Sequence, residues 1–211
     1  LCVCVSVCLC VCVSICVCLS PPPPVSADAL MSADLSRAPG LSVGEPIVEW
    51  LNQQQGNMVE LLRDLVNIDS NSFDKAGVDR VGTRLTAFFD NHEIPHETIP
   101  LEEYGDAIRA VVSGGDGNQP ILLCGHRDTV FPTGEVEKRP FSAADGKAFG
   151  PGVADMKPGL VINAFILAAF HKFGGHPNPL VGLFTGDEEI GSPASQDVIT
   201  AEAEKARLAF N

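Results

Sequence analysis

Three short stretches of the sequence end an apolar or glycine-rich run on a histidine or on carboxylates. They are ILLCGHRDTV (residues 121–130), GPGVADMK (150–157) and LFTGDEEIGS (183–192). Imidazole nitrogens and carboxylate oxygens bind metal ions in proteins, and ligands brought from the ends of several elements build such sites. We therefore take as candidate metal ligands His126, Asp155 and Glu189, and as candidate general base Glu188.

His126 and Asp128 are two residues apart, so a locally extended backbone turns both side chains to the same face. This spacing suits a metal ligand and its partner, because a ligating imidazole commonly donates its other N–H to a carboxylate. In this interpretation His126 is the ligand and Asp128 orients it. A His-x-Asp pair alone is more often a capped turn after a strand.

The two other stretches each leave an alternative open. Asp155 follows a glycine-containing run and precedes an apolar segment, so its carboxylate could cap a helix, bind a metal, or do both. Glu188 and Glu189 are adjacent, and in an extended backbone they would point apart, one to a metal and one to a water molecule. The alternative is an exposed acidic pair. Together with Asp187, however, they form a group of three neighbouring carboxylates after an apolar strand. A cation would offset the mutual repulsion of these carboxylates.

The elements around these stretches alternate between helical and strand patterns, which predicts an α/β fold. We expect a mixed, largely parallel sheet flanked by helices. The first helical pattern is an amphipathic helix over 47–68 with a weak point at Gly56, and a second over 78–89 stops at 91–95. A helix over 160–170 is apolar on almost every face. Residues 197–210 include helix and strand. The expected strands are 96–99, 107–112, 121–124 and 180–185.

Composition excludes one class of partner. The chain has 27 acidic and 14 basic residues and a formal charge of -13, with no basic cluster, which argues against nucleic acid. We also expect no membrane partner.

The first 30 residues form a low-complexity Cys/Val segment followed by a proline run. The interpretations are a membrane span, a signal peptide cleaved near Val25, Ser26 and Ala27, a thiolate metal cluster, or a translated repeat of alternating T and G nucleotides that is not genuine coding sequence. We favour the last, with a natural start at Met31 and a linker over 31–45. The location is then cytoplasmic, whereas a signal peptide over 1–27 would mean export. Taken alone, residues 1–20 also allow a secreted or membrane-tethered cysteine-rich protein.

From Ile47 to Asn211 the chain resembles the di-zinc exopeptidase and aminoacylase family, most closely its glutamate carboxypeptidase branch, through GHRDTV, GPGVADMKPG and TGDEEIGS. The resemblance implies that residues 46–211 are the N-terminal portion of a zinc exopeptidase-like catalytic domain. It implies two Zn2+ ions, for which Co2+ could substitute. Asp155 would bridge the ions, with a cis peptide to Met156, while His126 would bind one ion and Glu189 the other. Glu188 would be the base and Asp128 the partner of His126.

The implied reaction is hydrolysis of an amide bond, releasing a C-terminal, glutamate-like amino acid from a small peptide or an N-acyl amino acid. Within the family an aminoacylase, dipeptidase or desuccinylase-type deacylase is the alternative. The family uses two further metal ligands, a carboxylate expected just beyond Asn211 and a later histidine. Full-length members also have a lid domain, through which they form homodimers. We therefore expect a truncated product, and a chain that is inactive as it stands.

Overall fold

The computed structural model describes residues 44–115 and 118–211. The predictions for the Cys/Val segment and proline run at 1–30, and for nearly all of the linker at 31–45, fall outside the described residues. The first described element is helix α2 (Gly44–Gln53). Within the described ranges no helix has both the length and the apolar character needed to cross a bilayer.

A five-stranded sheet in the order β1-β2-β6-β3-β7 forms the centre of the fold. The strands are β1 (His96–Ile99), β2 (Ala107–Val112), β3 (Ile121–His126), β6 (Leu180–Thr185) and β7 (Leu208–Phe210). The β6–β3 and β3–β7 pairs are parallel, whereas β2 is antiparallel to both β1 and β6 and runs opposite to all the other strands. The expected mixed, largely parallel sheet is confirmed, and β3 extends beyond the expected Cys124 to His126.

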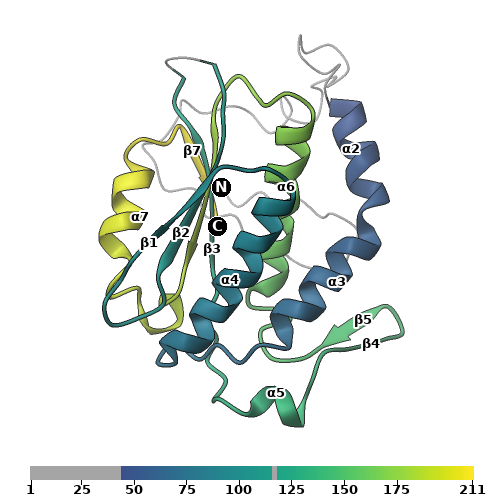
Figure 1. Ribbon diagram of the computed structural model, residues 1–211, viewed down its shortest axis with the longest axis vertical. Coiled ribbons are helices and arrows are strands. Elements are labelled where there is room, and N and C mark those ends of the chain that lie inside the picture. The colour runs from purple at the N-terminus through teal and green to yellow at the C-terminus, as the bar shows by residue number, and fades with distance from the viewer. Residues whose placement is uncertain (1–43, 116–117) are drawn as a thin grey trace, which may run out of the picture.

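Helices cover both faces of this sheet (Figure 1). One face carries α2, α3 (Gln55–Val66), α4 (Lys75–Asn91) and α6 (Lys157–Lys172), and α7 (Gln196–Ala203) lies on the other. The main core lies under the first group and includes the buried Leu85, Phe89, Phe165 and Phe184. A smaller core under α7 is formed around the buried strand residues Leu122, Val181 and Leu183.

The prediction of a single amphipathic helix over 47–68 is wrong in one respect, because the structure has two helices there. The chain breaks at Gln54, where φ is -89° and ψ is 1°, and the weak point at Gly56 lies inside α3. Both α2 and α3 contact α6. A bend between them lets both helices keep their apolar residues on that surface.

Helix α6 lies between the sheet and the α2–α3 pair, so it is buried on nearly all sides, as its composition predicted. Its side chains at Leu160, Phe165 and Leu167 are at most 2% exposed. Pro158 occupies the first turn, where a missing N–H costs little. Because α6 begins at Lys157, two residues after Asp155, packing of this helix positions the backbone of the loop that carries Asp155.

A short helix and a hairpin join β3 to α6, and the sequence patterns did not predict them. They are α5 (Glu135–Lys138), β4 (Ser142–Ala144) and β5 (Lys147–Phe149), with β4 antiparallel to β5. Asp145 and Gly146 connect the strands with φ values of 52° and 73°. Asp-Gly is the sequence pattern typical of such a two-residue hairpin turn.

Candidate metal centre

The candidate site lies where β3 and β6 end side by side. His126 is the last residue of β3 and is paired with Thr185, the last residue of β6. The short 3-10 helix η3 (Glu188–Ile190) follows β6 and brings Glu188 and Glu189 to the same edge. Asp155 reaches this edge from the loop before α6. The ends of two parallel strands and the loop before α6 thus bring the three motifs to one place.

Three candidate ligands converge there. One ligand atom each from His126, Asp155 and Glu189 lies within 4.8 Å of the others. Nε2 of His126 is 3.0 Å from Oδ1 of Asp155 and 3.6 Å from Oε2 of Glu188. His126 is buried, whereas the Asp155 side chain is 74% exposed. The cluster is therefore open to solvent on the Asp155 side, and its role as a metal site stays a prediction.

Asp128 connects both halves of this cluster. Its Oδ1 is 3.3 Å from Nδ1 of His126, the nitrogen on the far side of the ring from Asp155. The backbone N–H groups of Glu188 and Glu189 donate to the Asp128 carboxylate at 3.2 and 3.1 Å. Ser72 Oγ donates to Oδ2 at 2.6 Å. The His126 Nδ1 also lies 3.1 Å from the Asp128 carbonyl oxygen. The fully buried Asp128 carboxylate thus holds the turn that carries both glutamates, and its role as the group that orients His126 stays a prediction.

The prediction of an extended backbone at Glu188 and Glu189 is wrong, because both residues lie in the 3-10 helix η3. A 3-10 helix rotates successive side chains by about 120°, so the two carboxylates still diverge. Asp187 also differs from expectation, since it does not need a cation. Its side chain is buried and accepts from the backbone N–H groups of Ala194 and Ser195 at 2.7 and 3.0 Å and from the Ser195 hydroxyl.

Electrostatics at the cluster favours a positive charge. Burial lowers the pKa of His126, but the neighbouring Asp128, Glu188 and Asp155 outweigh burial and raise it to about 9. Burial, with the nearby Asp155 and other carboxylates, raises the pKa of Glu189 despite the opposing effect of His126. A divalent cation would satisfy the same surplus of carboxylates as the proton on His126.

Asp155 is not the side-chain cap of α6. The residue at the cap position is Met156, and no side-chain hydrogen bond caps the helix. The Asp155–Met156 peptide is cis, as the family resemblance implied. In the loop before it, Gly152 has a φ of 73°, and a Cβ there would lie 2.8 Å from Thr129 Cγ2. This glycine lets the Asp155 loop pack directly against the residue after Asp128.

Arg127 supports the site, and the sequence patterns did not single it out. Its side chain is buried and donates to the carbonyls of Thr185 at 3.3 Å, Val78 at 3.0 Å and Asp106. It therefore ties the end of β3 to the end of β6 and to α4. The sequence offered one signal for this role, the position of Arg127 between His126 and Asp128. In an extended strand this position turns the Arg127 side chain to the face opposite the other two.

Comparison with known proteins identifies the family. Residues 122–210 match the model of Peptidase family M20/M25/M40. Carboxypeptidase G2 from Pseudomonas sp. (strain RS-16) is 33% identical over 156 residues, which are 72% of this chain and 37% of that protein. Acetylornithine deacetylase from Proteus mirabilis (strain HI4320) is 32% identical over 148 residues, 66% of this chain and 38% of that enzyme. The chain thus spans less than two fifths of the length of these relatives.

Solved structures share the fold. Human carnosine dipeptidase 1 superimposes with a TM-score of 0.65 at 18% identity, over 79% of this chain and 39% of that one. A metallo-carboxypeptidase of the M20 family from Sulfolobus solfataricus gives a TM-score of 0.59 at 17% identity, over 72% and 35%. The family match includes β3, the Asp155 loop and η3, which carry the candidate site. Residues 122–210, which carry the candidate site, therefore form part of a domain of the peptidase family M20/M25/M40.

Proposed function

We propose that the protein is a zinc-dependent amidohydrolase that releases a C-terminal, glutamate-like amino acid from a peptide or an N-acyl conjugate. The observation that carries this proposal is the convergence of His126, Asp155 and Glu189 within 4.8 Å, with the Glu188 carboxylate 3.6 Å from the same imidazole. The similarity to carboxypeptidase G2 supports the choice of a carboxypeptidase within the family.

The donor set fits zinc, which binds imidazole nitrogen and carboxylate oxygen in hydrolases. His126 and Glu189 would hold two different ions, and Asp155 would bridge them. Bound zinc supplies Lewis acidity, which acidifies water and polarises the scissile carbonyl. Co2+ could take the same ligands.

The side chains of this chain would perform the remaining steps. Glu188 lies beside the ligands without being required as one, so it can accept a proton from the attacking water and later pass it to the leaving amine. Asp128 would keep the proton of a neutral His126 on Nδ1, which leaves the Nε2 lone pair directed toward Asp155. Because Asp128 also holds the backbone of Glu188, base and ligand keep a constant relative position.

A second candidate function is deacylation of an N-acyl amino acid. It is favoured by acetylornithine deacetylase and by succinyl-diaminopimelate desuccinylase from Xylella fastidiosa (strain M12), which is 38% identical over 95 residues. Release rates for N-benzoyl-glutamate, N-acetyl-ornithine and N-succinyl-diaminopimelate, measured side by side with zinc, would separate the two. A preference for either of the last two would replace the carboxypeptidase assignment.

The experiment that tests the mechanism is Glu188→Gln in the zinc-loaded chain. We expect zinc binding to persist and hydrolysis to fall by about 10²- to 10⁴-fold, the usual contribution of a general base. Glu102→Gln, an exposed residue of the β1–β2 loop, is the matched control. Full activity of Glu188→Gln would remove Glu188 from the base role. A zinc-loaded chain without activity on any substrate would instead support the inactive-fragment alternative.

A further inference from the structure

Lys157 is a buried cation next to the candidate metal centre, and the mechanism proposed above does not use it. It is the first residue of α6, two residues after Asp155, and it is fully buried. Burial of an ammonium group is unfavourable unless the group is hydrogen-bonded. The first turn of a helix is also the end at which the helix dipole disfavours a cation. The contacts of Lys157 must therefore explain why a lysine stands at this position.

The Lys157 side chain extends away from α6 to the end of α3. Its Nζ donates to the carbonyl oxygens of Leu65 and Ile68, both at 2.8 Å. Leu65 lies in the last turn of α3, and Ile68 follows the end of that helix at Val66. Carbonyl oxygens at a helix C-terminus favour a cation. These two hydrogen bonds attach the start of α6 to the end of α3.

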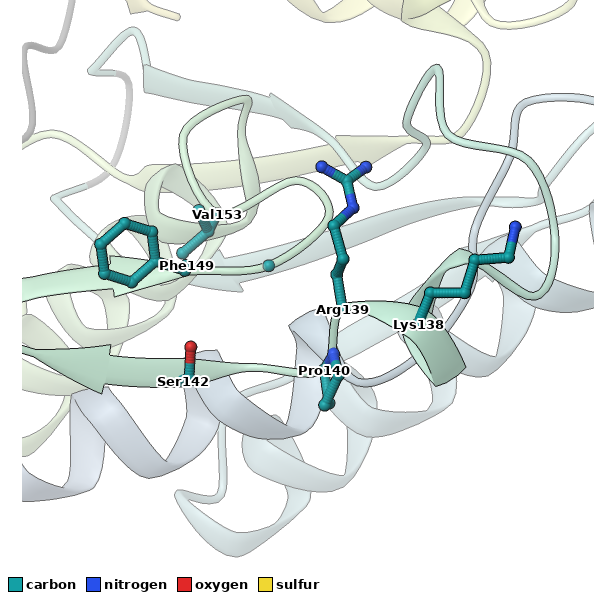
Figure 2. Close-up of a pocket in the computed structure, with 7 residues that line it drawn as sticks. Lys138, Arg139, Pro140, Ser142, Phe149 and Val153 are labelled. Carbon is teal, nitrogen blue, oxygen red and sulfur yellow. The ribbon is translucent and has the colours of Figure 1, made fainter.

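The backbone of Lys157 closes the loop that carries Asp155. Its N–H donates to the carbonyl oxygen of Gly152 at 3.0 Å, so Asp155 lies inside a closed turn. A Cβ at Gly152 would lie 3.2 Å from Lys157 Cδ, so the lysine side chain packs against the same turn. Val153, also in this loop, borders an open pocket of about 550 Å3, where Figure 2 shows it together with Phe149. The core does not enclose the loop at Val153, and the lysine gives it a buried attachment.

The chain segment that receives the lysine also holds the other half of the candidate site. This 68–72 segment begins with one of the two acceptor residues. The Ser70 carbonyl oxygen accepts from the N–H of Thr129 at 2.8 Å, and Ser72 Oγ donates to Asp128 at 2.6 Å. The 68–72 segment therefore contacts both the lysine ammonium group and the residues that follow β3.

The Asp155 carboxylate has little support of its own. Its side chain is 74% exposed, and among the described residues its one hydrogen-bond partner is His126, at 3.0 Å. The position of this carboxylate consequently depends on how its backbone is anchored. Lys157 provides such an anchor, because it joins the Asp155 loop to the 68–72 segment.

We propose that Lys157 is a positioning residue of the metal centre, which holds the Asp155 loop against the 68–72 segment and thereby sets the separation between Asp155 and His126. This inference rests on the proposed function, since it takes these two residues as metal ligands. The Lys157 ammonium group donates to backbone carbonyls, so it acts through the loop and not on the substrate.

Zinc affinity of Lys157→Met in the full chain tests the proposal, measured by competition with a chromophoric chelator after the thiols have been alkylated with iodoacetamide. Alkylation keeps the cysteines of residues 1–20 from competing for the metal. Methionine keeps an unbranched apolar side chain but has no donor for the two carbonyls. We expect the affinity to fall by about 10- to 100-fold, the usual effect of losing a group that orients metal ligands.

Lys157→Gln is the second variant. Its shorter side chain keeps an N–H donor for one of the two carbonyls, so its affinity for zinc should fall by a smaller factor. It keeps the test decisive if Lys157→Met does not fold, because wild-type affinity in Lys157→Gln would then overturn the proposal. All affinities are measured at a temperature at which circular dichroism shows the variant folded.

The visible spectrum of the Co2+-loaded chain supplies a readout that a change in stability alone would not move. The spectrum reports the coordination geometry of the ion, so its bands should shift in Lys157→Met. Leu167→Ala is the matched control, because Leu167 is fully buried in the same helix but lies away from the Asp155 loop. It should lower the melting temperature and leave the zinc affinity and the Co2+ spectrum unchanged.

Two results would overturn the positioning role alone: wild-type affinity and spectrum in folded Lys157→Met, or an equal loss of affinity in Leu167→Ala. If the alkylated wild type bound no zinc, the metal centre of the proposed function would be refuted, and this inference with it.

Discussion

Asp128 joins the two halves of the candidate metal centre, so Asp128→Asn is the most informative single substitution. The carboxylate accepts from the backbone N–H groups of Glu188 and Glu189 and from the Ser72 hydroxyl, and it lies 3.3 Å from the His126 ring. Asparagine has nearly the same shape but replaces one acceptor oxygen with a donor and removes the charge.

The cost can be worked out from these contacts. If the asparagine amide takes the place of Oδ1, it faces the Glu188 N–H, and if it takes the place of Oδ2, it faces the Glu189 N–H. Either orientation leaves one backbone donor without its acceptor, which costs about 1–3 kcal/mol. Loss of the charge beside His126 removes an orienting interaction of a kind that contributes about 10- to 100-fold to metal affinity. Both losses act on the fully buried position, where water cannot compensate.

We therefore expect Asp128→Asn to lower the free energy of unfolding by about 1–3 kcal/mol and to weaken zinc binding by about 10- to 100-fold. Urea unfolding of the metal-free chain measures the first effect, and competition with a chromophoric chelator measures the second. Ser72→Ala is the comparison, since it removes one hydrogen bond to the same carboxylate but leaves the charge. If Asp128→Asn bound zinc with an affinity within twofold of wild type, the assignment of His126 as a metal ligand oriented by Asp128 would be refuted.

Three further substitutions test the surrounding fold. Gly152→Ala should lower the free energy of unfolding by about 2–4 kcal/mol, because φ is 73° there and the new Cβ would lie 2.8 Å from Thr129 Cγ2; urea unfolding with an unchanged midpoint would contradict this. Phe89→Ala, at a fully buried core position, should cost about 3–5 kcal/mol in the same assay, and a loss below 1 kcal/mol would argue against the packing described. Glu202→Gln should cost about 1–2 kcal/mol at pH 7, because Glu202 pairs with Arg109 and Lys205. Burial opposes ionisation of Glu202, but these partners outweigh it and lower its pKa, so the difference from wild type should be present above the ordinary value of 4.5 and disappear as pH falls through the lowered pKa. If the difference in the free energy of unfolding between wild type and Glu202→Gln grew as the pH fell, the predicted direction of the pH dependence would be wrong.

The strands and the site residues were predictable from local pattern. β1, β2 and β6 have the expected bounds, because short apolar or alternating runs ended by glycine or polar residues favour strands independently of their neighbours. The convergence of His126, Glu188 and Glu189 follows from their positions after β3 and β6, since carboxyl ends of parallel strands meet at one edge of a sheet, whereas Asp155 comes from the loop before α6.

Other features depend on contacts between distant segments, which no local pattern specifies. The antiparallel β2 between β1 and β6, and the break at Gln54, result from packing on the sheet and on α6. Asp187 resembles its two acidic neighbours in sequence, yet only the folded turn gives it the N–H donors that satisfy it.

The sequence by itself determined which residues are candidate metal ligands and which segments form strands, because ligand chemistry and strand patterns are properties of residue types and short spacings. Only the tertiary structure decided that the Asp128 carboxylate accepts from the backbone N–H groups of both glutamates and that Arg127 is buried between β3, β6 and α4. These arrangements join residues that are tens of positions apart in the chain, and folding alone brings them within hydrogen-bonding distance.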